Sequence, residues 1–125
     1  MKNILLIYTG GTIGMIKDKK KNTLVPLNFD ELLKIIPELK SDEVDLDNIS
    51  TNIPIDSSNM SPNNWIEIAN LIENNYNIYD GFVILHGTDT MAYTASAFSF
   101  MLENLNKSVI FTGSQIPIGA RRSDA

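Results

Sequence analysis

Four short segments of the 125-residue chain combine small residues with hydroxyl or carboxylate side chains. They read TGGT (9–12), DSSNM (56–60), HGTDT (86–90) and TGSQ (112–115), and three of them directly follow an apolar run. Glycine lets the backbone approach a ligand closely, and exposed amides supply hydrogen-bond donors. The segments therefore predict a polar pocket rich in hydroxyls, with Asp56 and Asp89 as its carboxylates.

If such a pocket performs covalent chemistry, elimination leaves a hydroxyl group as the nucleophile. The sequence contains no cysteine and one histidine, His86, so neither a thiolate nor a zinc site is expected, and the histidine is expected to be structural. The glycine spacing fits neither a dinucleotide fingerprint nor a P-loop, and no spacing supports magnesium at Asp56 and Asp89. No metal or cofactor is expected. A hydroxyl needs a base and an oxyanion hole, and backbone amides around Gly11 and Thr88 suit that hole.

Each segment also has a purely structural explanation. Glycine and threonine after a strand often form only a turn, and Thr88 or Asp89 can cap the helix that follows. The DSS segment can be a turn that leads to a helix cap at Ser61. Repetition of the pattern at the same edge favours a pocket, because ligands of open α/β sheets bind beyond the carboxyl ends of the strands.

The elements that must position these residues follow from apolar patterning. Continuous apolar runs at 4–8, 82–85 and 109–111 predict strands covered on both faces, and a shorter strand is predicted at 52–56. Helices are predicted at 28–36, 61–76 and 89–105. The alternation of strands and helices predicts an α/β fold, a parallel, doubly wound, Rossmann-like sheet with flanking helices.

Finer expectations concern the helices and the charged segments. Ser61 is the expected N-cap of the second helix, whose apolar stripe runs from Trp65 to Tyr76 and faces the core. The helix at 89–105 is apolar or small all round and is expected to be buried on both sides. The lysine-rich segment 14–26 is expected to be a solvated mobile loop, and the acidic segment 40–52 to be irregular.

The overall charge limits the partners. A net charge of −5 argues against nucleic-acid and anionic-membrane surfaces, which require a basic field. No apolar run approaches the roughly 20 residues of a membrane span, and the amino-terminal run is too short for a signal peptide. We therefore expect a soluble, cytoplasmic protein.

The motifs together resemble a known family. YTGGTIGM (8–15), DSSNM (56–60), the segment 79–105 and TGSQIP (112–117) are similar to the bacterial-type L-asparaginases, and most similar to their cytoplasmic type I branch. The resemblance implies an amidohydrolase that converts L-asparagine to L-aspartate and ammonia through an acyl-enzyme. It also implies a homo-oligomer, a dimer or tetramer.

The resemblance assigns roles to residues of this sequence. It implies Thr12 as the nucleophile, and Thr88 with Asp89 as a second hydroxyl–carboxylate pair that works with a lysine. Thr9 is expected to serve the backbone of the turn. A zwitterionic substrate needs a carboxylate for its ammonium group and donors for its carboxylate. The implied substrate-binding residues are Asp56, Ser57, Ser58, Thr88, Asp89 and Ser114.

Two departures from the family keep alternatives open. Leu24 stands where the family usually carries a tyrosine near the nucleophile, so another residue activates Thr12 or the activity is altered. The family's catalytic lysine and second domain have no counterpart in this sequence, so residues 1–125 are expected to be a partial amino-terminal domain. The alternatives are a glutaminase-like, ammonia-supplying amidotransferase subunit and a truncated, non-catalytic fragment.

Overall fold

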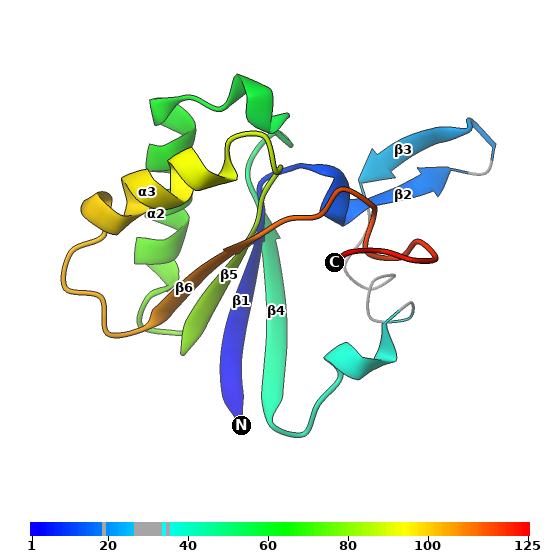
Figure 1. Ribbon diagram of the computed structural model, residues 1–125. Helices are drawn as coiled ribbons and strands as arrows, with labels where there is room; N and C mark the ends of the chain where they lie inside the picture. The colour runs from blue at the N-terminus through cyan, green and yellow to red at the C-terminus, as the bar shows by residue number, and fades with distance from the viewer. Residues whose placement is uncertain (19, 27–33, 35) are drawn as a thin grey trace.

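A four-stranded parallel sheet organises the chain. The computed structural model describes residues 1–18, 20–26, 34 and 36–125. The strand order is β4 (Val44–Ser50), β1 (Lys2–Tyr8), β5 (Gly81–Leu85) and β6 (Ser108–Thr112), and every neighbouring pair is parallel (Figure 1). This confirms the predicted α/β fold and three of its strands. The helix predicted at 28–36 lies almost entirely outside the described residues.

Two helices, α2 (Pro62–Asn75) and α3 (Met91–Met101), cover one face of this sheet (Figure 1). The strands and the helices share a single core cluster, in which every residue is at most 2% exposed: Leu5, Ile7, Ile68, Ile72, Phe82, Ile84 and Phe98. Burying each such side chain stabilises the fold by about 1.5–3 kcal/mol. The opposite face is less covered by the described residues, because Leu6 and Val83 are half-buried and Ile110 is 55% exposed.

Helix α2 begins as predicted. The backbone N–H of Ser61 donates to Asn64 Oδ1 at 2.9 Å, and the Ser61 hydroxyl donates to the same oxygen at 2.8 Å. Pro62 occupies the first turn, where a missing N–H costs nothing. The predicted stripe also faces the core, since Trp65 and Tyr76 pack against the cluster.

Two expectations about charged segments are wrong. The acidic segment contains β4, whose seven residues pair with β1 from Lys2–Val44 to Tyr8–Ser50. The lysine-rich segment forms an antiparallel hairpin of β2 (Met15–Asp18) and β3 (Thr23–Pro26) rather than a loop. Asp18 Oδ1 accepts from the backbone N–H groups of Lys20 and Lys21, which closes the turn.

The strand predicted at 52–56 is absent, and these residues lead instead from β4 into a 3-10 turn, η3 (Ser57–Asn59). Two further 3-10 turns are η1 (Thr12–Gly14) and η2 (Pro37–Leu39).

Helix α3 differs from its prediction in length and burial. It ends at Met101, because Leu102 is extended and Asn104 takes a positive φ of 55°, which an asparagine tolerates better than most residues. Phe98 is buried as expected, but Tyr93 is 71% and Phe100 is 85% exposed. The expectation of burial on both sides is therefore wrong for the described residues. None of the described helices is both long enough and apolar enough to cross a membrane.

Candidate active site

A pocket of about 300 Å³ lies beyond the carboxyl ends of the four parallel strands. Segments that follow β1, β4, β5 and β6 all contribute to its lining: Gly10, Gly11, Thr12, Met15, Pro54, Ile55, Asp56, Ser57, Gly87, Thr88, Asp89 and Gln115. The predicted convergence of strand ends on one polar pocket is thus confirmed. Five of the predicted site residues line it, namely Thr12, Asp56, Ser57, Thr88 and Asp89.

Two glycines allow the segment after β1 to reach this position. Gly10 has a φ of 135°, and a Cβ there would lie 2.1 Å from the carbonyl oxygen of Ile55. Gly11 has a φ of 85°, and a Cβ there would lie 2.6 Å from the Cα of Gly87. Both positions exclude a side chain, because the backbone is left-handed and its neighbours are main-chain atoms. The glycines therefore bring the backbone that carries Thr12 against two other walls of the pocket.

The two threonines of TGGT have different surroundings. Thr9 is fully buried, and its hydroxyl donates to the carbonyl oxygen of Leu85 at 3.0 Å. Its backbone carbonyl accepts from the N–H of Ile55 at 2.7 Å. Thr9 therefore has a structural role, and it joins three segments rather than only the turn that was predicted. Thr12 is the first residue of η1 and lines the pocket.

The DSS segment places a carboxylate at the pocket. Asp56 Oδ1 accepts from the Ser58 backbone N–H at 3.0 Å and from the Ser58 hydroxyl at 2.9 Å. These hydrogen bonds, the backbone one first, lower the pKa of the Asp56 carboxyl below its ordinary 3.8, so it is ionised at neutral pH. Ser57 is 3% exposed and lines the pocket, whereas Ser58 is exposed and is not among the lining residues.

Thr88 is held from two sides. Its methyl group lies 3.2 Å from where a Cβ of Gly113 would stand, and its hydroxyl accepts from Gln115 Nε2 at 2.8 Å. Gln115 lines the pocket, although sequence reasoning did not select it; its only signal was membership of TGSQ. Ser114, which was selected, is 4% exposed and donates its hydroxyl to the carbonyl oxygen of Ile116 at 2.6 Å, outside the lining.

His86 lies beneath the pocket in a buried hydrogen-bonded chain. Its Nδ1 is 2.6 Å from the carbonyl oxygen of Gly87, so Nδ1 carries the proton and donates. The neutral ring then accepts at Nε2 from the Thr94 hydroxyl at 2.9 Å, and Thr94 accepts from Trp65 Nε1 at 3.0 Å. Burial lowers the pKa of His86 despite the opposing effect of the Gly87 carbonyl. The prediction of a structural histidine agrees with these contacts.

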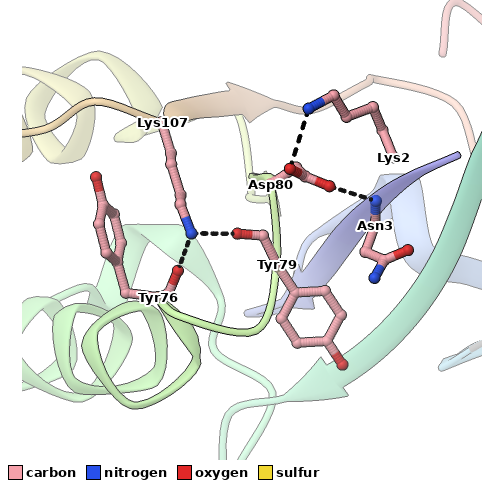
Figure 2. Close-up of polar contacts among 6 residues, drawn as sticks. All are labelled: Lys2, Asn3, Tyr76, Tyr79, Asp80 and Lys107. Carbon is pink, nitrogen blue, oxygen red and sulfur yellow. Dashed lines mark hydrogen bonds and ion pairs between the residues drawn. The ribbon is translucent and has the colours of Figure 1, made fainter.

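Basic side chains of the described residues lie elsewhere. None of the lysines or arginines in the described ranges lines the pocket. Lys2 and Lys107 lie at the amino ends of the strands and bind partners there (Figure 2). Leu24 pairs with Lys17 in the hairpin and is 47% exposed.

The pocket offers hydroxyls, backbone amides and carboxylates, a donor and acceptor set that suits a small zwitterion. The described part of the chain holds no group of three or more metal-binding side chains.

The fold and the site together define an α/β domain with a hydroxyl- and carboxylate-lined pocket at the carboxyl edge of a parallel sheet. The chain belongs to the asparaginase family, since the model of that family's amino-terminal domain, "Asparaginase, N-terminal", matches residues 3–125.

Individual relatives agree with this assignment. L-asparaginase 1 of Escherichia coli is 52% identical over 124 residues, which cover 98% of this chain and 37% of that protein. The crystal structure of L-asparaginase I from Vibrio cholerae superimposes with a TM-score of 0.86 at 51% identity, covering 98% of this chain and 37% of the other. A glutamyl-tRNA(Gln) amidotransferase subunit from Methanosphaera stadtmanae is 40% identical over 129 residues, or 99% of this chain and 28% of that protein. The chain therefore spans little more than a third of the length of the asparaginases it matches.

Proposed function

We propose that the complete protein containing this chain is a cytoplasmic, homo-oligomeric amidohydrolase that converts L-asparagine to L-aspartate and ammonia. One observation carries the proposal: Thr12, Asp56 and Asp89 line the same pocket. A carboxylate side chain binds the α-ammonium group of an amino acid, and a hydroxyl can attack its side-chain amide. The relatives named L-asparaginase support the same substrate.

In the proposed mechanism Thr12 is the nucleophile. Its Oγ attacks the amide carbon of asparagine and loses its proton, and the amide oxygen becomes an oxyanion. Backbone N–H groups around Gly11 and Thr88 are suited to stabilise that charge, because the Gly11 backbone packs directly against Gly87. The amide nitrogen gains a proton and leaves as ammonia, and a β-aspartyl ester remains on Thr12. Water then hydrolyses the ester to aspartate, with Thr88 and Asp89 as the second hydroxyl–carboxylate pair.

Substrate recognition relies on charge in this proposal. Asp56 is ionised at neutral pH, and among the described residues only its Oδ1 is engaged, with Ser58. Its Oδ2 can therefore accept from the substrate ammonium group, together with Asp89. We propose that Ser57 and Ser58 serve the α-carboxylate and that Ser114 serves the amide end. Neither Ser58 nor Ser114 is among the lining residues, and the buried Ser114 hydroxyl would have to leave the carbonyl oxygen of Ile116 to reach the substrate.

Ammonia release from asparagine tests the nucleophile. We expect Thr12→Ala to lower kcat of the complete protein by about 1,000-fold or more, because the acyl-enzyme cannot form. Thr23→Ala is the matched control, since Thr23 is an exposed residue of β3 outside the pocket. Equal rates for wild type and Thr12→Ala would refute the nucleophile assignment.

A second candidate function uses the same pocket to supply ammonia to a partner enzyme. The relative from Methanosphaera stadtmanae, part of a glutamyl-tRNA(Gln) amidotransferase, favours an ammonia-supplying subunit. Its identity of 40% is lower than the 52% of the Escherichia coli asparaginase, so we rank it second. Steady-state kinetics with asparagine and glutamine separate the two: turnover of asparagine without any partner protein, and a strong preference for it, contradict the amidotransferase function. Turnover by residues 1–125 alone would contradict the third possibility, a non-catalytic fragment.

A further inference from the structure

The contact between Gln115 and Thr88 joins two walls of the pocket. Gln115 follows β6 and Thr88 follows β5, yet Gln115 Nε2 lies 2.8 Å from Thr88 Oγ1. Both residues line the pocket. The contact is exposed to solvent, so a ligand in the pocket can reach it.

The loop that carries Gln115 is fixed by its own backbone contacts. The carboxylate of Asp124 accepts from the N–H of Gln115 at 3.0 Å and from the N–H of Ile116 at 2.9 Å. The carbonyl oxygen of Ile116 accepts from the hydroxyls of Ser114 and Ser123, at 2.6 Å and 3.2 Å. The backbone at Gln115 is therefore held by the loop independently of Thr88, and the side chain reaches Thr88 from this fixed point.

The chemistry of the two groups decides the direction of the hydrogen bond. A side-chain amide nitrogen only donates, so Thr88 Oγ1 accepts. The hydroxyl proton of Thr88 cannot then point at Gln115. Its methyl group lies near Gly113 and the residue lines the pocket, so we infer that the O–H points into the pocket. An N–H that donates to this oxygen also stabilises the negative charge that develops on it when the hydroxyl gives up its proton.

We propose that Gln115 is a positioning residue of the site, which directs the Thr88 hydroxyl into the pocket and stabilises its oxygen during the reaction. This inference rests on the proposed function, in which Thr88 and Asp89 assist the hydrolysis. Gln115 acts through Thr88, so its loss affects turnover more than substrate affinity.

Two variants of the complete protein separate this role from mere packing. Gln115→Met keeps the length of the side chain and removes the donor, and we expect kcat for asparagine to fall about 10-fold with KM changed less than twofold. Gln115→Glu keeps the shape but only accepts when ionised, so Thr88 must turn its proton toward it. We expect a loss of about 100-fold in kcat at pH 8.

The pH profile of Gln115→Glu provides a readout that packing does not change. A protonated carboxyl can donate to Thr88 again, so the ratio of its kcat to that of wild type is expected to rise as the pH falls. Asp56 and Asp89 line the same pocket, Asp124 holds the loop, and none of the described cations lines the pocket. These negative charges act to raise the pKa of the introduced carboxyl. The ratio for Gln115→Met is expected to stay flat.

A double-mutant cycle adds the coupling between the two residues. In a Thr88→Val background, Gln115→Met is expected to cause no further loss of kcat. The inference is wrong if both Gln115 variants stay within twofold of the wild-type kcat, or if Gln115→Met causes the same loss with and without the Thr88 hydroxyl. Equal thermal stability of the variants excludes misfolding as the cause.

A spectroscopic experiment tests the contact between Gln115 and Thr88 independently of the proposed function. If the wild-type protein releases no ammonia from asparagine, the proposed function fails. The side-chain amide resonance of Gln115 then decides the positioning contact by itself. We expect it to shift in Thr88→Val and not in the control Thr90→Val, because the Thr90 hydroxyl donates to the carbonyl oxygen of Ser57. An unchanged resonance in Thr88→Val would overturn the inference.

Discussion

The two ends of the parallel sheet differ in whether their charged side chains already have partners. At the amino edge, Asp80 accepts from Lys2 Nζ at 3.1 Å and from the Asn3 N–H at 2.9 Å (Figure 2). Lys107 donates to the carbonyl oxygens of Tyr76 and Tyr79, which close the carboxyl end of α2 (Figure 2). Each charged side chain shown in Figure 2 is therefore already bound to a neighbouring residue.

At the carboxyl edge the carboxylates have no such cation. Neither Asp56 nor Asp89 forms an ion pair with a described lysine or arginine, and both line the pocket. The comparison teaches that charged side chains alone do not distinguish a binding site from a structural region. A binding site is distinguished by hydrogen-bonding groups that have no partner within the protein, because only such groups are available to a ligand.

The largest effect expected from this comparison is on stability. Gly10→Ala forces a Cβ against the carbonyl oxygen of Ile55 at a φ of 135°, which we expect to cost about 3 kcal/mol through strain and overpacking. Gly81→Ala at the amino edge is the matched control, since its Cβ meets the end of a flexible Ile4 side chain at 3.1 Å. We expect it to cost less than about 1 kcal/mol. Urea unfolding of both variants measures the difference, and similar losses would contradict the account.

A smaller effect is expected on substrate affinity. Asp56→Asn removes the charge for the substrate ammonium group and is expected to raise KM for asparagine about 30-fold, the equivalent of a charge-assisted hydrogen bond of about 2 kcal/mol. Asp80→Asn changes the same kind of side chain at the other edge, and we expect KM to stay within twofold. Steady-state kinetics test both variants. An unchanged KM for Asp56→Asn would remove the distinction between the edges.

The smallest expected effect is the pH dependence contributed by His86 below the pocket. Its pKa is lowered from 6.5, mainly by burial, so the unfolded chain binds a proton at a higher pH than the folded protein. Between the two pKa values the unfolded state holds more protons, so stability falls as the pH drops below about 6.5 and is unaffected above it. His86→Gln is expected to lack this component. Free energies of unfolding at pH 7.5 and 5.5 measure it, and an identical decline in both proteins would contradict the prediction.

Much of the fold was predictable, because the buried strands and α2 have strong apolar patterns. Strand β4 was missed because Asp45 and Asp47 made its segment look like a loop. They project outward from an edge strand, while Val44 and Leu46 alternate with them and are half-buried. The period-two pattern was present in the sequence, but the acidic residues on the exposed face of this edge strand obscured it.

The sequence predicted which segments of the chain form the site. Glycines and hydroxyls at strand ends indicated the pocket, and the structure brings those ends together. The particular side chains were harder, because TGSQ contains two adjacent polar residues that face different ways. Ser114 turns into its own loop and Gln115 reaches Thr88. That difference depends on the side-chain carboxylate of Asp124, which accepts from the backbone N–H of Gln115 nine residues away and which no local pattern reveals.

The most direct test of the central claim is to trap the acyl-enzyme. The complete protein is mixed with asparagine, quenched in acid within one turnover and digested, and its peptides are analysed by mass spectrometry. The account predicts a β-aspartyl group on the peptide that contains Thr12, and its absence in Thr12→Ala. A β-aspartyl group on a different residue, while turnover continues, would contradict it.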